Sequence, residues 1–158
     1  MSSLQPLRRP LLMTFMIAAL AFFWASPIAR AATMPLTSAP PVEVIPYTSY
    51  TGYTYLSYSN VGMTDNGNQT SKISAVTQSK SVVSELGAVI QLQRWTGSDW
   101  VDIGSAVTIK AANSSNFSDF ANLSTPSGYY YRGKVTHYAK QGATTESAVA
   151  YTSSLLVG

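Results

Sequence analysis

The stretch VIQLQRWTGSDWVDIG, Val89–Gly104, contains two runs of alternating side chains on either side of a short polar turn. In an extended strand, successive side chains point to opposite faces of the sheet. The segment TGSD, residues 96–99, supplies residues typical of a turn between antiparallel strands. The stretch therefore predicts a β-hairpin with one buried face. Its predicted core residues are Ala88, Ile90, Leu92, Val101 and Ile103.

The same alternation places both tryptophans on the outer face, with Trp95 opposite Trp100 and Gln93 opposite Asp102. One interpretation is a structural clasp, since cross-strand aromatic pairs stabilise hairpins by about 0.2–1 kcal/mol. The other is a binding platform, because flat rings beside amides and carboxylates suit a sugar, whose C–H face stacks while its hydroxyls form hydrogen bonds. The predicted platform comprises Gln91, Gln93, Trp95, Trp100 and Asp102.

Arg94 complicates this register, because strict alternation directs its charged side chain toward the core. A β-bulge would shift the register by one residue and send a tryptophan inward instead. Both registers remain open at the level of sequence.

Outside the hairpin, further short runs with β propensity are separated by turn residues. DNGN, residues 65–68, is a strong hairpin signal, while SKSVVSELG, residues 79–87, could form one helical turn. The pattern predicts an all-β fold, an antiparallel two-sheet sandwich of about seven strands. The expected strands are residues 55–64, 70–78, 88–96, 100–110, 116–123, 129–139 and 145–157.

The N-terminal region has the three parts of a secretory signal. Arg8 and Arg9 precede an apolar run, Leu11–Ala25, and Ala29-Arg30-Ala31 offers small residues at the cleavage positions. The alternative, an uncleaved membrane anchor, would need about 20 apolar residues, and this run is shorter. We therefore expect a signal peptide at 1–31, a proline-rich tether at 32–53 and a β-sandwich domain at 54–158, secreted and outside any membrane.

Charge and cysteine content narrow the class of partner. Removal of residues 1–31 takes away Arg8, Arg9 and Arg30 and leaves equal numbers of basic and acidic residues. No basic stripe remains to neutralise phosphates, which argues against nucleic acid as a partner. The chain has 0 cysteines, whereas small secreted eukaryotic domains usually contain disulfides. This absence favours a bacterial exporter.

Candidates for catalysis are few. His137 is the only histidine, and a lone histidine near a strand end is usually structural. Asp99 and Asp102 are close enough to suggest general acid/base work, but exposed carboxylates at a hairpin more often serve solvation. The sequence has no clustered His or Cys for zinc, and DNGNQT lacks the closing glutamate of a calcium loop. We expect no catalytic residue, no metal and no cofactor.

Five tyrosines gather near the start of the expected domain, among serines and threonines: Tyr47, Tyr50, Tyr53, Tyr55 and Tyr58. Such a composition is typical of adhesive surfaces, because tyrosine combines apolar area with a polar tip. The alternative is that these rings cover an open sheet edge.

LQRWTGSDWVDIG and SGYYYRGKVTHYAKQGATTESAVAYTSSL together resemble a family of small secreted proteins of Gram-positive bacteria that contain a domain of unknown function. The resemblance spans roughly residues 50–157 and implies secretion and a β-sandwich, without catalytic residues. Where that family has valine, this chain has Gly133, a sign of a possible bulge. The GYYYR strand also resembles fibronectin type III and immunoglobulin-like domains, in which Tyr129 or Tyr131 would form the tyrosine corner.

These patterns predict a secreted, non-catalytic extracellular module that binds a polysaccharide or cell-surface protein, or that has a structural role. The alternative expectation is a secreted hydrolase or a hydrolase inhibitor, with acidic residues near the tryptophan hairpin.

Overall fold

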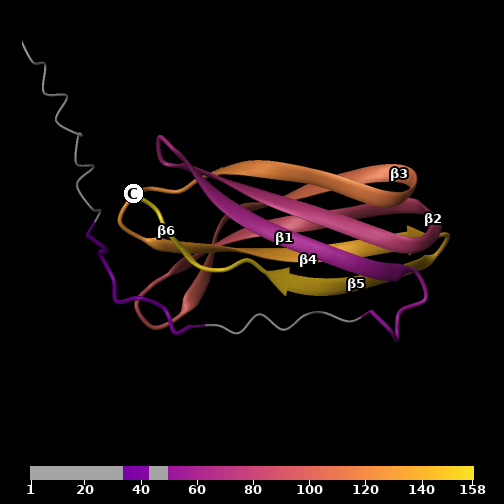
Figure 1. Cartoon of the computed structure of the whole chain (residues 1–158), viewed down its shortest axis with the longest axis horizontal. Coiled ribbons are helices and arrows are strands. Elements are labelled where there is room, and N and C mark those ends of the chain that lie inside the picture. The colour runs from indigo at the N-terminus through magenta and orange to yellow at the C-terminus, as the bar shows by residue number, and fades with distance from the viewer. Residues whose placement is uncertain (1–33, 43–49) are drawn as a thin grey trace, which may run out of the picture. The chain divides into compact units, whose positions relative to one another are not determined.

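The computed structural model describes residues 34–42 and 50–158, and within them the fold is all-β and antiparallel. Six strands form one sheet: β1 (Leu56–Gly67), β2 (Thr70–Trp95), β3 (Trp100–Ser124), β4 (Tyr130–Gln141), β5 (Thr144–Tyr151) and β6 (Leu155–Leu156). The order is β1-β2-β4-β5, with β3 on the other side of β2 and β6 beside β4. Figure 1 shows that β2 and β3 run together, curl at one end and fold back.

The expected strands are present, but two pairs of them are continuous. β2 is 26 residues long and contains both 70–78 and 88–95, while β3 is 25 residues long and contains both 100–110 and 116–123. The expected strand 145–157 is in turn divided into β5 and β6, because residues 152–154 are not in a strand. One curled sheet of six strands thus stands where seven strands in two sheets were expected. The difference lies in the connections, because each long strand bends and continues where the sequence suggested a break.

The bend of β2 lies in the segment for which a helical turn was conceivable. Residues 79–87 are extended, and the register with β3 shifts between Gln78 and Val83. The Ser79 hydroxyl donates to the Ser81 carbonyl at 2.7 Å, a local bond typical of a bend. The matching bend in β3 contains Asn113, whose φ of 50° is a conformation that asparagine tolerates better than most residues.

Because of these bends, the sheet has two halves that face each other. The first half-sheet contains β1, residues 70–78 of β2 and residues 116–124 of β3. The second half-sheet contains residues 83–95 of β2, residues 100–114 of β3, and β4 and β5. One apolar cluster draws side chains from both half-sheets, and its fully buried members include Leu56, Ile73, Leu86, Ile90, Tyr131 and Val135.

Gly133 shows how closely the half-sheets approach. A Cβ at this position would lie 2.9 Å from Ile73 Cγ2 and 3.2 Å from Thr152 Cγ2. The register of Gly133 with Leu92 is regular, without the bulge that the sequence suggested. The glycine therefore makes room for a side chain from the opposite half-sheet.

The expected DNGN turn is confirmed, and a tyrosine hydroxyl bonds the turn before β4. The DNGN hairpin joins β1 to β2, with positive φ at Gly67, Asn68 and Gln69. Of the two candidate corner tyrosines, Tyr131 is the one that is fully buried, and its hydroxyl donates to the Pro126 carbonyl at 2.9 Å. This bond fixes the start of β4 to the preceding turn.

The expected signal peptide, 1–31, lies outside the described residues, as does part of the expected tether. In the described part of that tether, the Leu36 N–H donates to the Gly128 carbonyl at 2.7 Å. The Ser38 hydroxyl donates to the Gly97 carbonyl at 3.3 Å. Residues 36–38 therefore contact the turns that precede β3 and β4.

Candidate functional site

The tryptophan hairpin has the predicted register. Trp95 pairs with Trp100 and Gln93 pairs with Asp102. The Thr96 N–H donates to the Asp99 carbonyl at 2.9 Å and closes the loop, in which Gly97 has a φ of 107°. The two indole rings lie 5.4 Å apart at an interplanar angle of 55°. Both rings project from the face of the second half-sheet that is opposite the core.

Neighbouring strands extend this outer surface, which we call the Trp100 face. The side chains on this face are those of Gln93, Trp95, Trp100, Asp102, Arg132, Lys134 and Tyr151. Gln93 is only 7% exposed, so its predicted place on an exposed platform is wrong. The Arg132 guanidinium lies 4.4 Å from the Trp100 ring centroid and 4.3 Å from that of Tyr151. Such cation–π contacts are typically worth about 0.5–2 kcal/mol. The guanidinium thus contacts two aromatic rings that are distant from each other in the sequence.

A chain of polar contacts runs across the same face. Arg132 Nε donates to Gln93 Oε1 at 2.8 Å, and Gln93 Nε2 donates to Asp102 Oδ1 at 2.6 Å. The second oxygen of Asp102 lies 4.0 Å from Lys134 Nζ. The Gln93 amide is therefore oriented at both ends, with its oxygen toward the cation and its nitrogen toward the carboxylate.

Trp95 lies on the predicted outer face of the sheet, but the prediction that it is exposed is wrong. Its side chain is only 7% exposed, and its indole N–H has no hydrogen-bond partner among the described atoms. Trp100 is half-buried. Of the two tryptophans in the predicted platform, Trp95 is therefore a packed residue, and only the Trp100 ring is accessible at the surface.

Gln91 also differs from its expected role. Its side-chain nitrogen donates to the backbone carbonyls of Leu92 at 3.1 Å and Ile103 at 2.9 Å. The register between β2 and β3 shifts at this point, and Gly104 has a φ of 66°. Gln91 therefore satisfies carbonyl groups beside a bulge, a use that competes with ligand binding.

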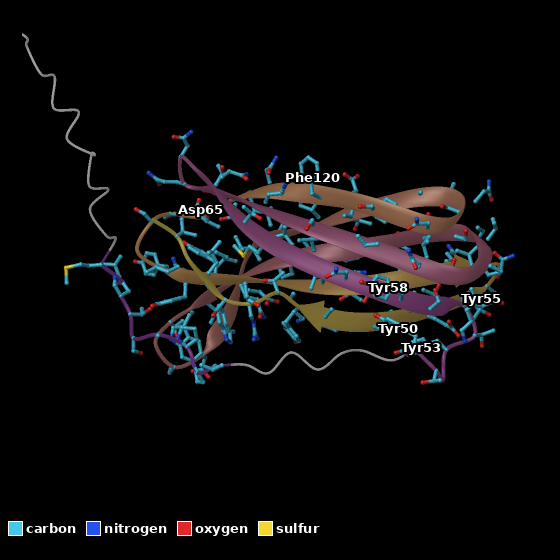
Figure 2. The ribbon with its side chains drawn as sticks, in the orientation of Figure 1. Tyr50, Tyr53, Tyr55, Tyr58, Asp65 and Phe120 are labelled. Carbon is cyan, nitrogen blue, oxygen red and sulfur yellow. The ribbon has the colours of Figure 1, made fainter. Side chains whose placement is uncertain are left out.

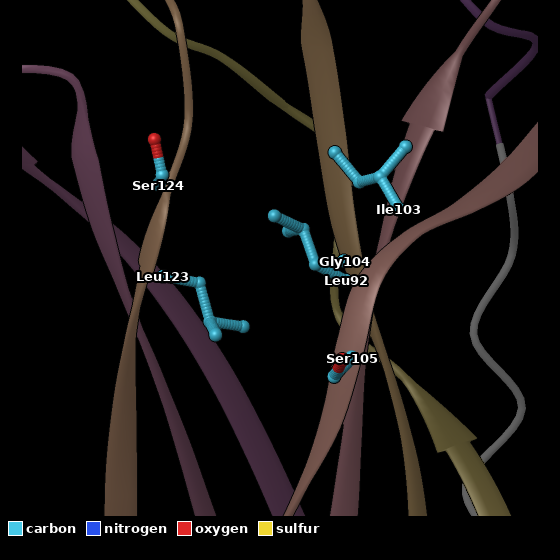
Figure 3. Close-up of a pocket in the computed structure, with 6 residues that line it drawn as sticks. All are labelled: Leu92, Ile103, Gly104, Ser105, Leu123 and Ser124. Carbon is cyan, nitrogen blue, oxygen red and sulfur yellow. The ribbon is translucent and has the colours of Figure 1, made fainter.

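On the core side of that bulge is a small hollow of about 120 Å³. Figure 3 shows Leu92 and Ile103 on one side and Leu123 on the other, with Gly104, Ser105 and Ser124 completing the lining. The hollow lies between the first and last parts of β3 and is mainly apolar. It is large enough for a few atoms, not for a sugar ring.

Arg94 does lie on the core-side face, and no bulge is needed to accommodate it. The register is regular from Leu92 to Trp95. The guanidinium lies 4.8 Å from the Tyr129 ring centroid, near the end of the strand. Val101, which pairs with Arg94, is 37% exposed, so its predicted burial is wrong. Both residues lie where the half-sheet ends and less of the core covers them.

His137 is fully buried in the second half-sheet, away from the Trp100 face. Its Nδ1 forms a 2.7 Å hydrogen bond with the Thr77 hydroxyl, while Nε2 has no partner among the described atoms. Burial lowers its pKa from 6.5 to about 4, so the ring is neutral at pH 7. This is the structural role that the sequence favoured for the lone histidine.

The carboxylates near the hairpin have separate partners. Asp99 Oδ2 accepts a bond from the Ser98 hydroxyl at 2.8 Å in the loop, whereas Asp102 contacts Gln93 and Lys134. Elsewhere, Glu85 bonds Lys110 and Tyr138, and the Lys110 contact contributes most to lowering its pKa. Among the described residues, no three His, Asp or Glu side chains are grouped closely enough to hold a metal ion.

The tyrosine cluster lies where β1 begins, beside β5 (Figure 2). Tyr50 is 3% exposed, packs edge-on against Tyr53 and bonds Ser59 through its hydroxyl. The Tyr53 hydroxyl donates to the Ser147 carbonyl in β5 at 3.2 Å. These contacts favour the edge-covering interpretation over an adhesive surface. Tyr47 lies outside the described residues.

Glu146 strengthens the same junction. Its carboxylate accepts hydrogen bonds from the backbone N–H groups of Thr54 at 2.6 Å, Tyr55 at 2.7 Å and Leu56 at 3.1 Å. Desolvation raises its pKa, but the three backbone donors outweigh it and bring the pKa below its usual value. One side chain of β5 thus fixes the start of β1.

Sequence reasoning missed three members of the Trp100 face: Arg132, Lys134 and Tyr151. Their alternation with buried Tyr131, Gly133 and Val135 on β4 was a usable signal for Arg132 and Lys134. The sequence contains no signal that these residues lie close to the hairpin, because that proximity depends on the pairing of β4 with β2 across about 40 residues of chain.

No protein-family model matches the chain, and no curated protein matches it. One solved structure, described as a protein from Archaeoglobus fulgidus, aligns over 65% of this chain and 98% of its own, with 14% identity and a TM-score of 0.35. No helix in the described part of the chain is long and apolar enough to cross a membrane.

Proposed function

We propose that this chain is a secreted, non-catalytic extracellular module whose Trp100 face binds polysaccharide. The observation that carries the proposal is the arrangement of Trp100, Arg132 and Tyr151 as a contiguous aromatic and cationic surface on three strands. A ring held in place by its neighbours loses little conformational freedom on binding. Asp102 and Lys134 lie beside it and provide an acceptor and donors for sugar hydroxyls.

The secretion and family parts of this proposal rest on the sequence. The three-part N-terminal signal supports export, and the hairpin and GYYYR strand support kinship with the secreted Gram-positive family. The facing half-sheets and the Tyr131 corner bond support a relationship to two-layer immunoglobulin-like sandwiches. No observation on the described residues favours the hydrolase or inhibitor alternative, so it is not proposed.

The test is retention of the purified protein on insoluble cell-wall and plant polysaccharides. The whole chain is expressed, and the protein is purified as the host processes it. Trp100→Ala should abolish retention while the protein remains folded by circular dichroism. Tyr58→Ala, which removes a half-buried ring from the first half-sheet, is the matched control and should be retained like the wild type. Wild-type protein that passes through every polymer refutes the proposal.

A further inference from the structure

The second part of β3 has an edge that no other strand covers. Residues Asn116–Ser124 pair with β2 along one edge, and within the described residues no strand pairs with the other. An open edge presents unpaired N–H and C=O groups, which natural sheets usually protect with charges, prolines or bulges. Between residues 116 and 124 there is no proline, and Asp119 is the only charged residue. This edge is therefore weakly protected.

Phe120 lies in the middle of this edge. Its side chain is 50% exposed on the outer face, with Lys72 Nζ 5.6 Å from its ring centroid. Figure 2 shows it along β3, away from Tyr50 and Tyr53. The Phe120 N–H donates to the carboxylate of Asp119 at 2.8 Å. Asp119 pairs with the buried Ala75, so its side chain lies on the core-side face of the sheet. Asp119 is nevertheless exposed, because it lies on an edge strand.

The sequence of this edge is complementary to itself in one register. If two copies pair antiparallel about a two-fold axis at Phe120, the two Phe120 rings lie opposite each other on the outer face. On the core-side face, Phe117 then lies opposite Leu123, and Asp119 opposite Ala121. A centre at Asp119 would instead place two carboxylates directly opposite, which is unfavourable.

We propose that a second copy of this chain pairs with the open edge of β3, centred on Phe120. The interface is isologous, as a two-fold dimer requires. Phe120 stacks on its counterpart, and the carbonyl of the second copy replaces the Asp119 carboxylate as acceptor for the Phe120 N–H. Phe117 of the second copy lies opposite Leu123, one wall of the apolar hollow, and adds apolar cover there. The dimer does not involve the Trp100 face, so it stands independently of polysaccharide binding.

The first measurement is the mass of the wild-type protein by sedimentation over a wide concentration range, where a dimer is expected at the upper end. Phe120→Lys places two ammonium groups opposite each other and should weaken the dimer about tenfold or more. Asp119→Ala removes the edge charge and its competing bond, and should strengthen the dimer. Circular dichroism confirms that each variant is folded.

A cysteine cross-link tests the register, because the chain has 0 cysteines of its own. Directly opposite residues have Cα atoms about 4.5–5.5 Å apart, within the range of a disulfide. Phe120→Cys should therefore form a disulfide dimer under mild oxidation. Val149→Cys, at an exposed position of similar accessibility on β5, is the control and should remain monomeric. A wild type that is monomeric throughout overturns the proposal, as does a dimer that cross-links at 149 in preference to 120.

Discussion

The buried histidine predicts a specific loss of stability in acid. His137 has a folded-state pKa of about 4, against 6.5 for an exposed imidazole, because its site is inaccessible to water. Below pH 6.5 the unfolded chain binds a proton at this residue that the folded chain does not bind until about pH 4. The free energy of unfolding is therefore at its full value above pH 6.5, and it decreases as the pH falls from 6.5 toward 4.

The expected magnitude follows from linkage. A difference between 6.5 and about 4 in the pKa corresponds to roughly 3 kcal/mol at 1.36 kcal/mol per unit. Roughly half of this loss should already be present at pH 5. For a domain whose total stability is of the order of 5–15 kcal/mol, such a loss is large.

The assay is urea denaturation of wild type and His137→Phe at a series of pH values between 7 and 5. This window lies above the region in which the hydrogen-bonded carboxylates Glu85 and Glu146 protonate. The wild type should lose stability with falling pH, while the phenylalanine variant should have a flat profile. Thr77, which loses its imidazole partner in this variant, retains the Gly87 carbonyl at 3.3 Å. Equal slopes in the two proteins would refute the reasoning.

Three further predictions concern the packing and the edge contacts. Glu146→Gln should lower the free energy of unfolding by about 1 kcal/mol, since it weakens three backbone contacts that are partly screened by solvent, as measured by urea denaturation. Gly133→Ala should cost about 1–3 kcal/mol by overpacking against Cγ2 and Cδ1 of Ile73, and it should cost less in an Ile73→Ala background, which lacks both atoms, as a double-mutant cycle measures. Trp95→Ala should cost about 3–5 kcal/mol by calorimetry, and Trp100→Ala clearly less, because only the first ring is buried.

Alternation predicted the hairpin well because it depends only on local geometry. The pairing of Trp95 with Trp100, and the burial of Ala88, Ile90 and Leu92, both follow from the two-residue period of a strand. Burial of Trp95 and exposure of Val101 do not follow from it. They depend on which other segments lie over each face, and that information is spread along the chain.

The sequence did not predict that β2 and β3 are continuous strands, for a related reason. The bend at residues 79–83 of β2 has serine and lysine where a turn is usual, and its apolar residues have no clear period. A bent strand and two strands joined by a loop therefore have the same local signature. What distinguishes them is the continued pairing of β2 with β3 on both sides of the bend, from Gln78–Asn116 to Val83–Ser114. That pairing is a property of the two strands together.

The Trp100 face and the open edge of β3 differ in how much rearrangement binding requires. On the Trp100 face, Gln93 and Arg132 are already oriented by each other, and the aromatic rings by the guanidinium between them. Binding there requires little rearrangement. On the edge of β3, pairing must first displace the Asp119 carboxylate from the Phe120 N–H. Removal of that carboxylate in Asp119→Ala should therefore strengthen edge pairing relative to the wild type at pH 7, where His137 is neutral and does not destabilise the fold. Sedimentation of both proteins at pH 7 measures this difference, and equal dimerisation of the two would show that the Asp119 carboxylate does not compete for the Phe120 N–H.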